Sequence, residues 1–206
     1  AKSKRRWTIG TVCVVLLIAA ILFLNSGFLY KSTAAVKIGD EGYSPAQTSY
    51  SYAAQYYNFA NQYGDYAGIF GLDTSTGISG LGSQPCGMLD EGTWRDYFLE
   101  GALGQMLQTK TLLDYAAAEG ISLTEDEIAA VDANFANVEL MATAYGFANV
   151  DNYLAANYGE GVNLDVVRQA EMDATLASKA ANHYFNSLEY SDAERAAHYE
   201  SYEGAE

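Results

Sequence analysis

Hydrophobic positions in this chain form one long uncharged run, followed by shorter stripes at helical spacing. The run covers residues 9–30 and follows a basic segment at 1–8. A helix of about 20 mainly apolar residues is long enough to cross the hydrocarbon layer of a membrane. Basic residues before such a helix favour a cytoplasmic N-terminus. We therefore expect a cytoplasmic tail at 1–8, a transmembrane anchor at 9–30 and an extracytoplasmic domain at 31–206 in a single-pass protein of the cell membrane.

A cleaved signal peptide is the alternative reading of the same segment. The apolar core of a signal peptide usually has about 7–15 residues, which is shorter than this run. Small residues at Thr33, Ala34 and Ala35 offer a cleavage site. The length favours the uncleaved anchor.

Beyond residue 36 the pattern predicts a mainly helical domain. Residues 36–43 have the spacing of a brief strand or turn, punctuated by glycines. Capping residues then mark successive helix starts, among them Ser44 with Gln47 and Thr124 with Glu127. The expected helices run from 45 to 63, from 93 to 119, from 125 to about 145, from 150 to 157, from 164 to 188, and from 192 past Tyr202. The fold class is thus all-α with a short β element, preceded by one transmembrane helix.

Helical spacing also predicts which face of the long helix 164–188 is buried. That face holds Val167, Ala170, Ala174, Ala177, Ala181, Tyr184 and Leu188.

A glycine-rich loop at 64–92 separates the first two helices. Most connections in compact domains have about 2–8 residues, so a loop of this length is expected to be either functional or mobile. Its glycines do not form a phosphate-binding loop, because no Gly-Lys-Ser or Gly-Lys-Thr follows them.

Charge and composition exclude several classes of function for the domain. Residues 31–206 contain 26 acidic residues against seven basic ones, a formal charge of −19. This charge opposes nucleic-acid binding, which requires basic residues against phosphates. His183 and His198 are isolated in sequence, and Cys86 is the one cysteine after the apolar run, so no metal-ligand set or cofactor motif is present. We expect no cofactor and no catalytic residues.

The order of these elements resembles the N-terminal chaperone region of the SurA/PrsA-like foldases. The resemblance covers about residues 36–204. It rests on the opening at 36–44, the turn Ala117-x-Glu119-Gly120-Ile121-x-Leu123-Thr124-x-x-Glu127, the segment 152–159, and the Ser191–Glu194 cap followed by His198 and Tyr199.

The resemblance implies a membrane-anchored, extracytoplasmic foldase module that binds unfolded or nascent secreted polypeptides. In that family the module belongs to a peptidyl-prolyl cis-trans isomerase with a parvulin-type catalytic domain. The sequence departs from the pattern in two ways: it contains no parvulin domain, and no lipid-attachment cysteine follows its apolar run. Isomerase activity is therefore expected only if a parvulin domain follows residue 206. A non-catalytic cell-surface interaction or scaffold protein is the alternative function.

Aromatic and methionine side chains on the helices are the candidates for peptide binding, because such side chains adapt to varied apolar surfaces. Apolar stripes more often face a core, so burial in the core is the competing interpretation. With 17 tyrosines in the chain, some hydroxyl groups are expected to line an exposed cleft. The candidates are Tyr56, Tyr57, Phe59, Tyr63, Trp94, Phe98, Met106 and Met141.

Overall fold

The structure is a computed structural model that describes residues 34–189 and 191–203. The predicted tail at 1–8 and anchor at 9–30 lie outside the described residues. Within the part that is described, no helix combines the length and apolar character that a membrane span requires.

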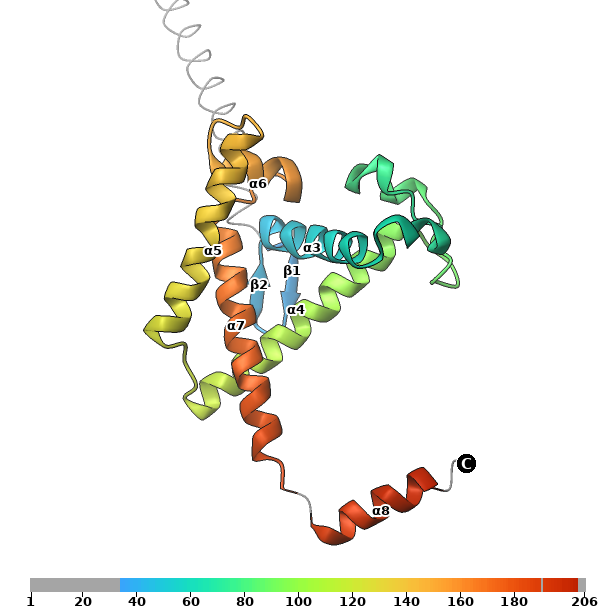
Figure 1. Ribbon diagram of the computed structural model, residues 1–206, viewed down its shortest axis with the longest axis vertical. Coiled ribbons are helices and arrows are strands. Elements are labelled where there is room, and N and C mark those ends of the chain that lie inside the picture. Colours follow the sequence, from blue (N-terminus) through green and yellow to red (C-terminus); the bar gives the residue numbers. More distant parts are fainter. Residues whose placement is uncertain (1–33, 190, 204–206) are drawn as a thin grey trace, which may run out of the picture.

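The domain is mainly helical, as the sequence predicts. Two short strands, β1 (Val36–Ile38) and β2 (Glu41–Tyr43), precede the helices. The helices are α3 (Pro45–Tyr63), α4 (Trp94–Glu119), α5 (Glu125–Ala144), α6 (Val150–Tyr158), α7 (Leu164–Ser187) and α8 (Asp192–Glu203). In Figure 1, α3 and α4 cross, α5 and α7 run side by side, and α8 lies beyond the end of α7, away from the other helices.

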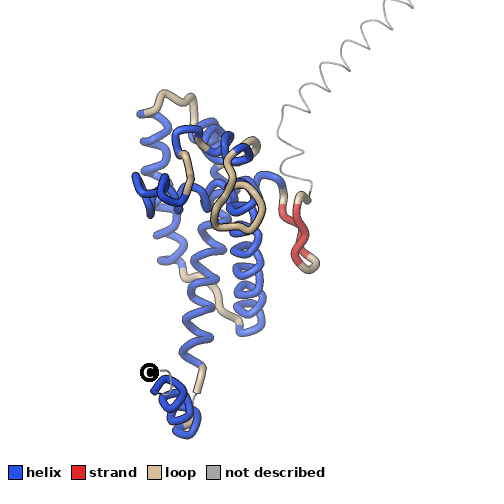
Figure 2. The backbone as a smooth tube through the Cα atoms, turned by 90° about the vertical axis from the view of Figure 1, so that its right-hand side faces the viewer, coloured by secondary structure: helices blue, strands red, loops and turns tan. Residues whose placement is uncertain are grey.

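The β element is an antiparallel hairpin in which Val36 pairs with Tyr43. Gly39 lies at its turn with φ of +61°, a conformation that glycine adopts without steric cost. Figure 2 shows the hairpin beside the helices. Since β2 runs directly into α3, the hairpin places Tyr43 next to the first helix.

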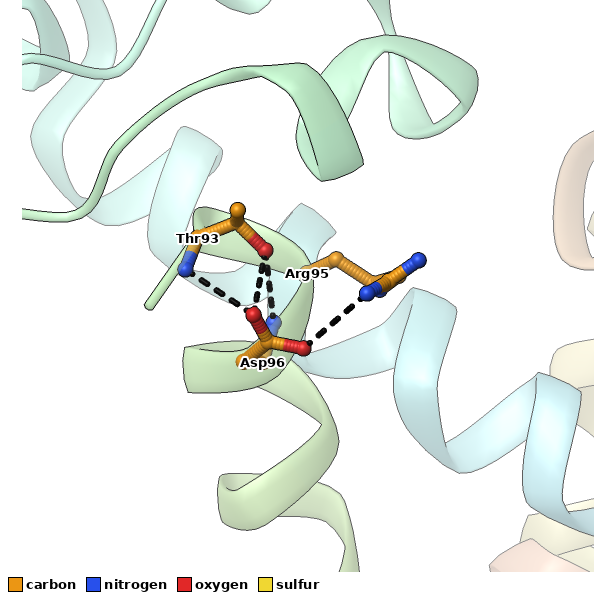
Figure 3. A network of polar contacts seen from close by, with 3 residues as sticks. All are labelled: Thr93, Arg95 and Asp96. Atoms are coloured by element: carbon orange, nitrogen blue, oxygen red, sulfur yellow. Dashed lines mark hydrogen bonds and ion pairs between the residues drawn. The ribbon is translucent and has the colours of Figure 1, made fainter. Parts of the chain in front are cut away.

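Helix starts are fixed by side-chain caps at the predicted positions. Ser44 and Gln47 form a reciprocal capping box on α3, and Thr124 and Glu127 form another on α5. On α4 the Thr93 backbone N–H donates to Asp96 Oδ2 at 2.9 Å, and the Asp96 N–H donates to Thr93 Oγ1 at 3.4 Å. Figure 3 shows this network, to which Arg95 Nη2 adds a hydrogen bond to Asp96 Oδ1. Each box satisfies backbone donors that the first helical turn leaves unpaired.

The segment 64–92 is an ordered part of the fold. It contains three 3₁₀ helices, η1 (Gly64–Phe70), η2 (Thr74–Thr76) and η3 (Ile78–Ser83). The Trp94 Nε1–H donates to the Gly71 carbonyl at 3.2 Å, and the Tyr56 hydroxyl donates to the Thr74 carbonyl at 3.3 Å. The segment is thereby held against α3 and α4, so the predicted glycine-rich loop contains short helical turns and packs on the domain.

Two hydrophobic clusters stabilise the domain, and α3 contributes to both. The first cluster joins α3, the segment 64–92 and α4 through Tyr56, Phe59, Ala67, Leu72, Leu81, Cys86, Trp94 and Phe98. The second joins the start of α3 to α6 and α7 through Ala46, Leu154, Val162 and Val167. Cys86 is a free, buried cysteine that packs as a small apolar residue.

The buried face of α7 differs in part from the predicted one. Val167 and Ala177 are buried as expected, and Met172 and Ala180 join them. Tyr184 is 46% exposed, although its ring lies 5.6 Å from the ring of Tyr115 on α4. Ala174 is also exposed.

Candidate functional site

A cavity of about 370 Å³ lies between α3, α4 and α7. We refer to it as the groove. Tyr43 of the hairpin and Tyr158 of α6 also line it. It lies where α3 passes from one hydrophobic cluster to the other, so its walls are held on both sides by packed residues.

Three tyrosines form one wall of the groove. The Tyr158 ring lies between the other two, with centroids 5.2 Å from the Tyr50 ring and 5.5 Å from the Tyr57 ring. Aromatic rings attract one another at such separations. The Tyr57 hydroxyl donates to the Asn157 carbonyl at 3.1 Å, which ties α3 to α6. Burial raises the pKa of all three phenols, so all three are neutral hydrogen-bonding groups at physiological pH.

Two carboxylates from α7 face the same space. Glu171 Oε1 accepts a 2.9 Å hydrogen bond from the Tyr50 hydroxyl. Asp173 Oδ1 accepts a 2.8 Å hydrogen bond from Gln169 Nε2, one turn before it. Burial, with a contribution from the negative charge of Glu41, raises the pKa of Asp173 above its usual range. No Lys or Arg side chain lines the groove among the described residues.

Side-chain amides supply most of the remaining polar lining. They are Gln47, Asn58, Asn61, Gln105 and Gln169. An amide side chain offers both donors and an acceptor, as a peptide backbone does. The groove therefore combines aromatic faces, neutral hydrogen-bonding groups and negative charge.

A second, more open hollow of about 510 Å³ continues along α3 and α4. Asn58 lines both spaces. Gln55, which lines the second hollow, donates a hydrogen bond to Gln105, which lines the groove. This bond links α3 to α4 at the point where the two spaces meet. The two spaces together follow the line along which α3 packs against α4.

Half of the predicted peptide-binding residues belong to the first hydrophobic cluster. They are Tyr56, Phe59, Trp94 and Phe98, and Trp94 is fully buried. Burial in the core was the competing interpretation of these residues. Phe59 and Phe98 also line the second hollow, whereas Tyr56 and Trp94 line neither space.

The other four candidates have three different surroundings. Tyr57 and the largely buried Met106 line the groove. Tyr63 lines the second hollow. Met141 is 51% exposed on α5, where the Tyr153 hydroxyl lies 3.9 Å from its sulfur. The structure thus brings only Tyr57 and Met106 together in the groove.

Sequence reasoning missed four residues that define the groove: Tyr50, Tyr158, Glu171 and Asp173. Tyr50 carried a signal, since it is one of several tyrosines on the first helix. The two carboxylates gave no comparable signal, since charged residues on a helix usually face solvent.

Chemically, the groove is suited to binding. Within the described residues, no three His, Cys, Asp or Glu side chains are grouped so that they could hold a metal ion.

Comparison of the chain with protein-family models, with curated proteins and with solved structures found no match.

Proposed function

We propose that the domain is a polypeptide-binding module of the chaperone type, held at the outer face of a membrane by residues 9–30. The observation that carries the proposal is the groove of about 370 Å³ between α3, α4 and α7. Binding sites for small ligands and peptide side chains commonly have volumes of about 300–1,000 Å³. The resemblance to the SurA/PrsA-like foldases supports the same function.

The lining of the groove matches the chemistry of an unfolded chain. Tyr50, Tyr57 and Tyr158 offer ring faces to apolar and aromatic side chains. Asn58, Asn61 and Gln105 offer donors and acceptors to peptide groups that are not paired in secondary structure. Because both kinds of contact are common to most polypeptides, the groove suits many clients.

The arrangement also favours an extended ligand. The second hollow continues the groove along α3 and α4 and shares Asn58 with it. A segment that lies across Asn58 would contact both spaces. Prolyl isomerisation belongs to the parvulin domain of the foldases, so we propose the binding role alone for residues 31–206.

The test is suppression of aggregation by the full chain in lipid nanodiscs. Two unrelated denatured proteins are diluted from denaturant, and light scattering is followed with and without the chain. We expect suppression of both. Ala174 is an exposed residue of α7 that lines the groove and also a hollow beside Lys179, and Ala174→Trp narrows the groove without removing a core contact. This variant should weaken suppression by about tenfold, which corresponds to about 1.4 kcal/mol of binding free energy.

Ala133→Trp is the matched control, because Ala133 is an exposed alanine of α5 outside the groove. The proposal predicts that this variant suppresses aggregation as the unaltered chain does. If neither client is protected, or if both tryptophan variants lose activity equally, the groove is not a polypeptide-binding site. Such a result would favour the alternative, a cell-surface interaction protein with a dedicated partner.

A further inference from the structure

We propose that the groove selects polypeptide segments that carry Lys or Arg, with the cationic side chain paired to Glu171 or to Asp173. This inference rests on the proposed polypeptide-binding function and adds the chemical class of segment that is bound. It follows from the groove's charge, from the use of the chain's own cations and from the position of the tyrosine rings.

The groove contains negative charge without a matching positive charge. Glu171 and Asp173 both line it, and in the part of the chain that the structure describes neither carboxylate forms an ion pair with a Lys or Arg. Asp173 is half-buried, and its one hydrogen-bond donor is the neutral amide of Gln169. A half-buried carboxylate without a cation is electrostatically unfavourable. A cation supplied by a ligand would relieve this cost.

The domain's own basic residues are engaged elsewhere. Of the six Lys and Arg residues that the structure describes, five form ion pairs with carboxylates outside the groove. Lys110 contacts Glu41 and Asp114, Arg168 contacts Asp132, and Lys179 contacts Glu127. The sixth, Lys37 of β1, does not line the groove. None of these six described side chains supplies the matching cation, so we assign that role to a ligand.

The surroundings of the carboxylates fit a cationic side chain better than a bare ion. Tyr50, whose hydroxyl contacts Glu171, and its neighbour Tyr158 present aromatic rings on the wall of the groove. Such rings attract ammonium and guanidinium groups and also pack against the aliphatic stems of Lys and Arg. Among the described residues, no third His, Cys, Asp or Glu side chain joins the two carboxylates in a metal-binding group.

The amide groups of the groove extend the match from the side chain to the backbone. Gln47, Asn58 and Asn61 line the α3 side of the space. They supply donors and acceptors for the peptide groups on either side of a bound Lys or Arg. The ligand class is therefore a basic residue within an unfolded segment, and not a free amine.

The experiment measures binding of fluorescein-labelled peptides to the full chain in lipid nanodiscs made of zwitterionic lipid. Two unstructured peptides of equal length and aromatic content are compared, one with three Lys and one with Gln at the same positions. We expect the Lys peptide to bind about fivefold more tightly, the effect of two partly exposed ion pairs. The double variant Glu171→Gln/Asp173→Asn should remove this preference, so that it binds the Lys peptide and the Gln peptide with equal affinity.

A control double variant separates the groove from the overall charge of the domain. Glu119 and Glu189 are exposed carboxylates outside the groove, and Glu119→Gln/Glu189→Gln changes the net charge by the same amount. This variant should keep the preference for the Lys peptide. Equal loss of preference in the two double variants would show non-specific attraction and overturn the inference.

The remaining outcomes distinguish this inference from the proposed function. If both peptides bind equally and Ala174→Trp abolishes both, polypeptide binding stands and cation selection is wrong. If neither peptide binds, both proposals are wrong. If free calcium ions compete with the Lys peptide for the unaltered chain but not for the groove double variant, the carboxylates form a metal site instead.

Discussion

The hydroxyl of Tyr50 on α3 donates a 2.9 Å hydrogen bond to Glu171 on α7, across 121 positions of sequence. This contact links α3 and α7, two of the helices that line the groove. It also places a neutral donor beside a carboxylate, which keeps Glu171 oriented toward the groove.

Tyr50→Phe removes that hydrogen bond and keeps the ring that contacts Tyr158. We expect the free energy of unfolding to fall by about 0.5–1.5 kcal/mol, the usual net worth of a hydrogen bond. Urea unfolding followed by circular dichroism measures the change. Tyr66→Phe is the control, since Tyr66 is 69% exposed, and its effect should stay within about 0.5 kcal/mol. Equal effects would mean that the Tyr50–Glu171 contact does not stabilise the fold.

Glu127 makes the attachment of α5 to α7 sensitive to acid. Its carboxylate accepts hydrogen bonds from Lys179 Nζ and from the Thr124 backbone N–H, both at 2.7 Å. These contacts lower the pKa of Glu127 from 4.5 to about 2. The folded state therefore favours the ionised form, so this stabilisation is present above pH 4.5 and is lost as the pH falls toward about 2.

Glu127→Gln should remove this part of the pH dependence. The variant should unfold at lower urea concentration than the unaltered chain at neutral pH, and the difference should disappear as the pH approaches about 2. Glu125→Gln provides a control in the same helical turn, because Glu125 forms no ion pair among the described residues. If Glu127→Gln still unfolded at a lower urea concentration than the unaltered chain at low pH, the result would contradict this account.

Asp173→Asn should raise the free energy of unfolding at neutral pH, whereas Glu127→Gln should lower it. Burial and Glu41 raise the pKa of Asp173 above 3.8, and the Gln169 hydrogen bond only partly offsets them. Lys110 lies 3.8 Å from Glu41 and moderates its charge. The folded state thus holds the Asp173 proton more tightly than the unfolded chain does, and the ionised form is unfavourable once the pH rises above the raised pKa.

The Asn variant is accordingly expected to be more stable than the unaltered chain at neutral pH, with the difference vanishing below pH 3.8. Asp165→Asn is a useful contrast on the same helix. Asp165 lies in the first turn of α7, where a negative charge favours the helix, so its removal should lower stability slightly. Thermal unfolding at several pH values measures both variants. A loss of stability in Asp173→Asn at neutral pH would show that the carboxylate is favourably solvated.

Gly159 ends α6 at a point of close approach to α3. Its φ is +117°, and a Cβ atom there would lie 2.9 Å from Ser49 Oγ. Gly159→Ala should therefore cost about 1–3 kcal/mol through strain and overpacking. Gly104→Ala is the opposite case, since Gly104 lies within α4 and nothing is near its Cβ position. That change should stabilise the protein by about 0.5–1 kcal/mol. Urea unfolding of the two variants should give shifts of opposite sign.

Trp94 fixes the segment 64–92 on the helices. Its ring contacts Phe59 and Phe98, and its N–H donates to the Gly71 carbonyl. Trp94→Ala should cost about 3–5 kcal/mol. The buried Cys86 thiol reports on the segment, because a thiol reagent reaches it only when the cluster opens.

The reactivity of Cys86 is measured in a chain whose other cysteine is replaced, Cys13→Ser. We expect slow labelling of the native fold and much faster labelling after Trp94→Ala. Leu107→Ala on the exposed side of α4 should leave the rate unchanged, since Leu107 is 55% exposed. Fast labelling without any substitution would mean that the segment is not held in place.

Local chemistry explains why the helices could be predicted and the groove could not. A capping box needs only residues three positions apart, so Ser44, Thr93 and Thr124 mark helix starts in the sequence itself. The groove depends on pairs such as Tyr50 and Glu171, whose distance in sequence gives no hint of contact. From the sequence alone, Tyr and Glu at such positions are equally compatible with a solvent-exposed helix surface.

Hydrophobic periodicity also predicts which face of a helix is buried, but it does not predict how much of that face the neighbouring helices cover. The spacing that correctly buries Val167 and Ala177 also points to Tyr184, which is 46% exposed although Tyr115 of α4 contacts one side of its ring. In the segment 64–92, frequent glycine suggests a plain loop. The burial of Leu72 and Leu81 depends on Trp94 and Phe59, and that contact is tertiary.

Among the described elements, α3 alone supplies buried residues to both hydrophobic clusters, and its remaining face forms the groove. Few positions on this helix are therefore free to vary. A mutational scan should find α3 the least tolerant helix of the domain, whether the scan selects for folding or for binding. Changes in α3 will tend to affect both properties together, so new ligand preferences should arise more readily through α7, where Glu171 and Ala174 reach the groove from exposed positions.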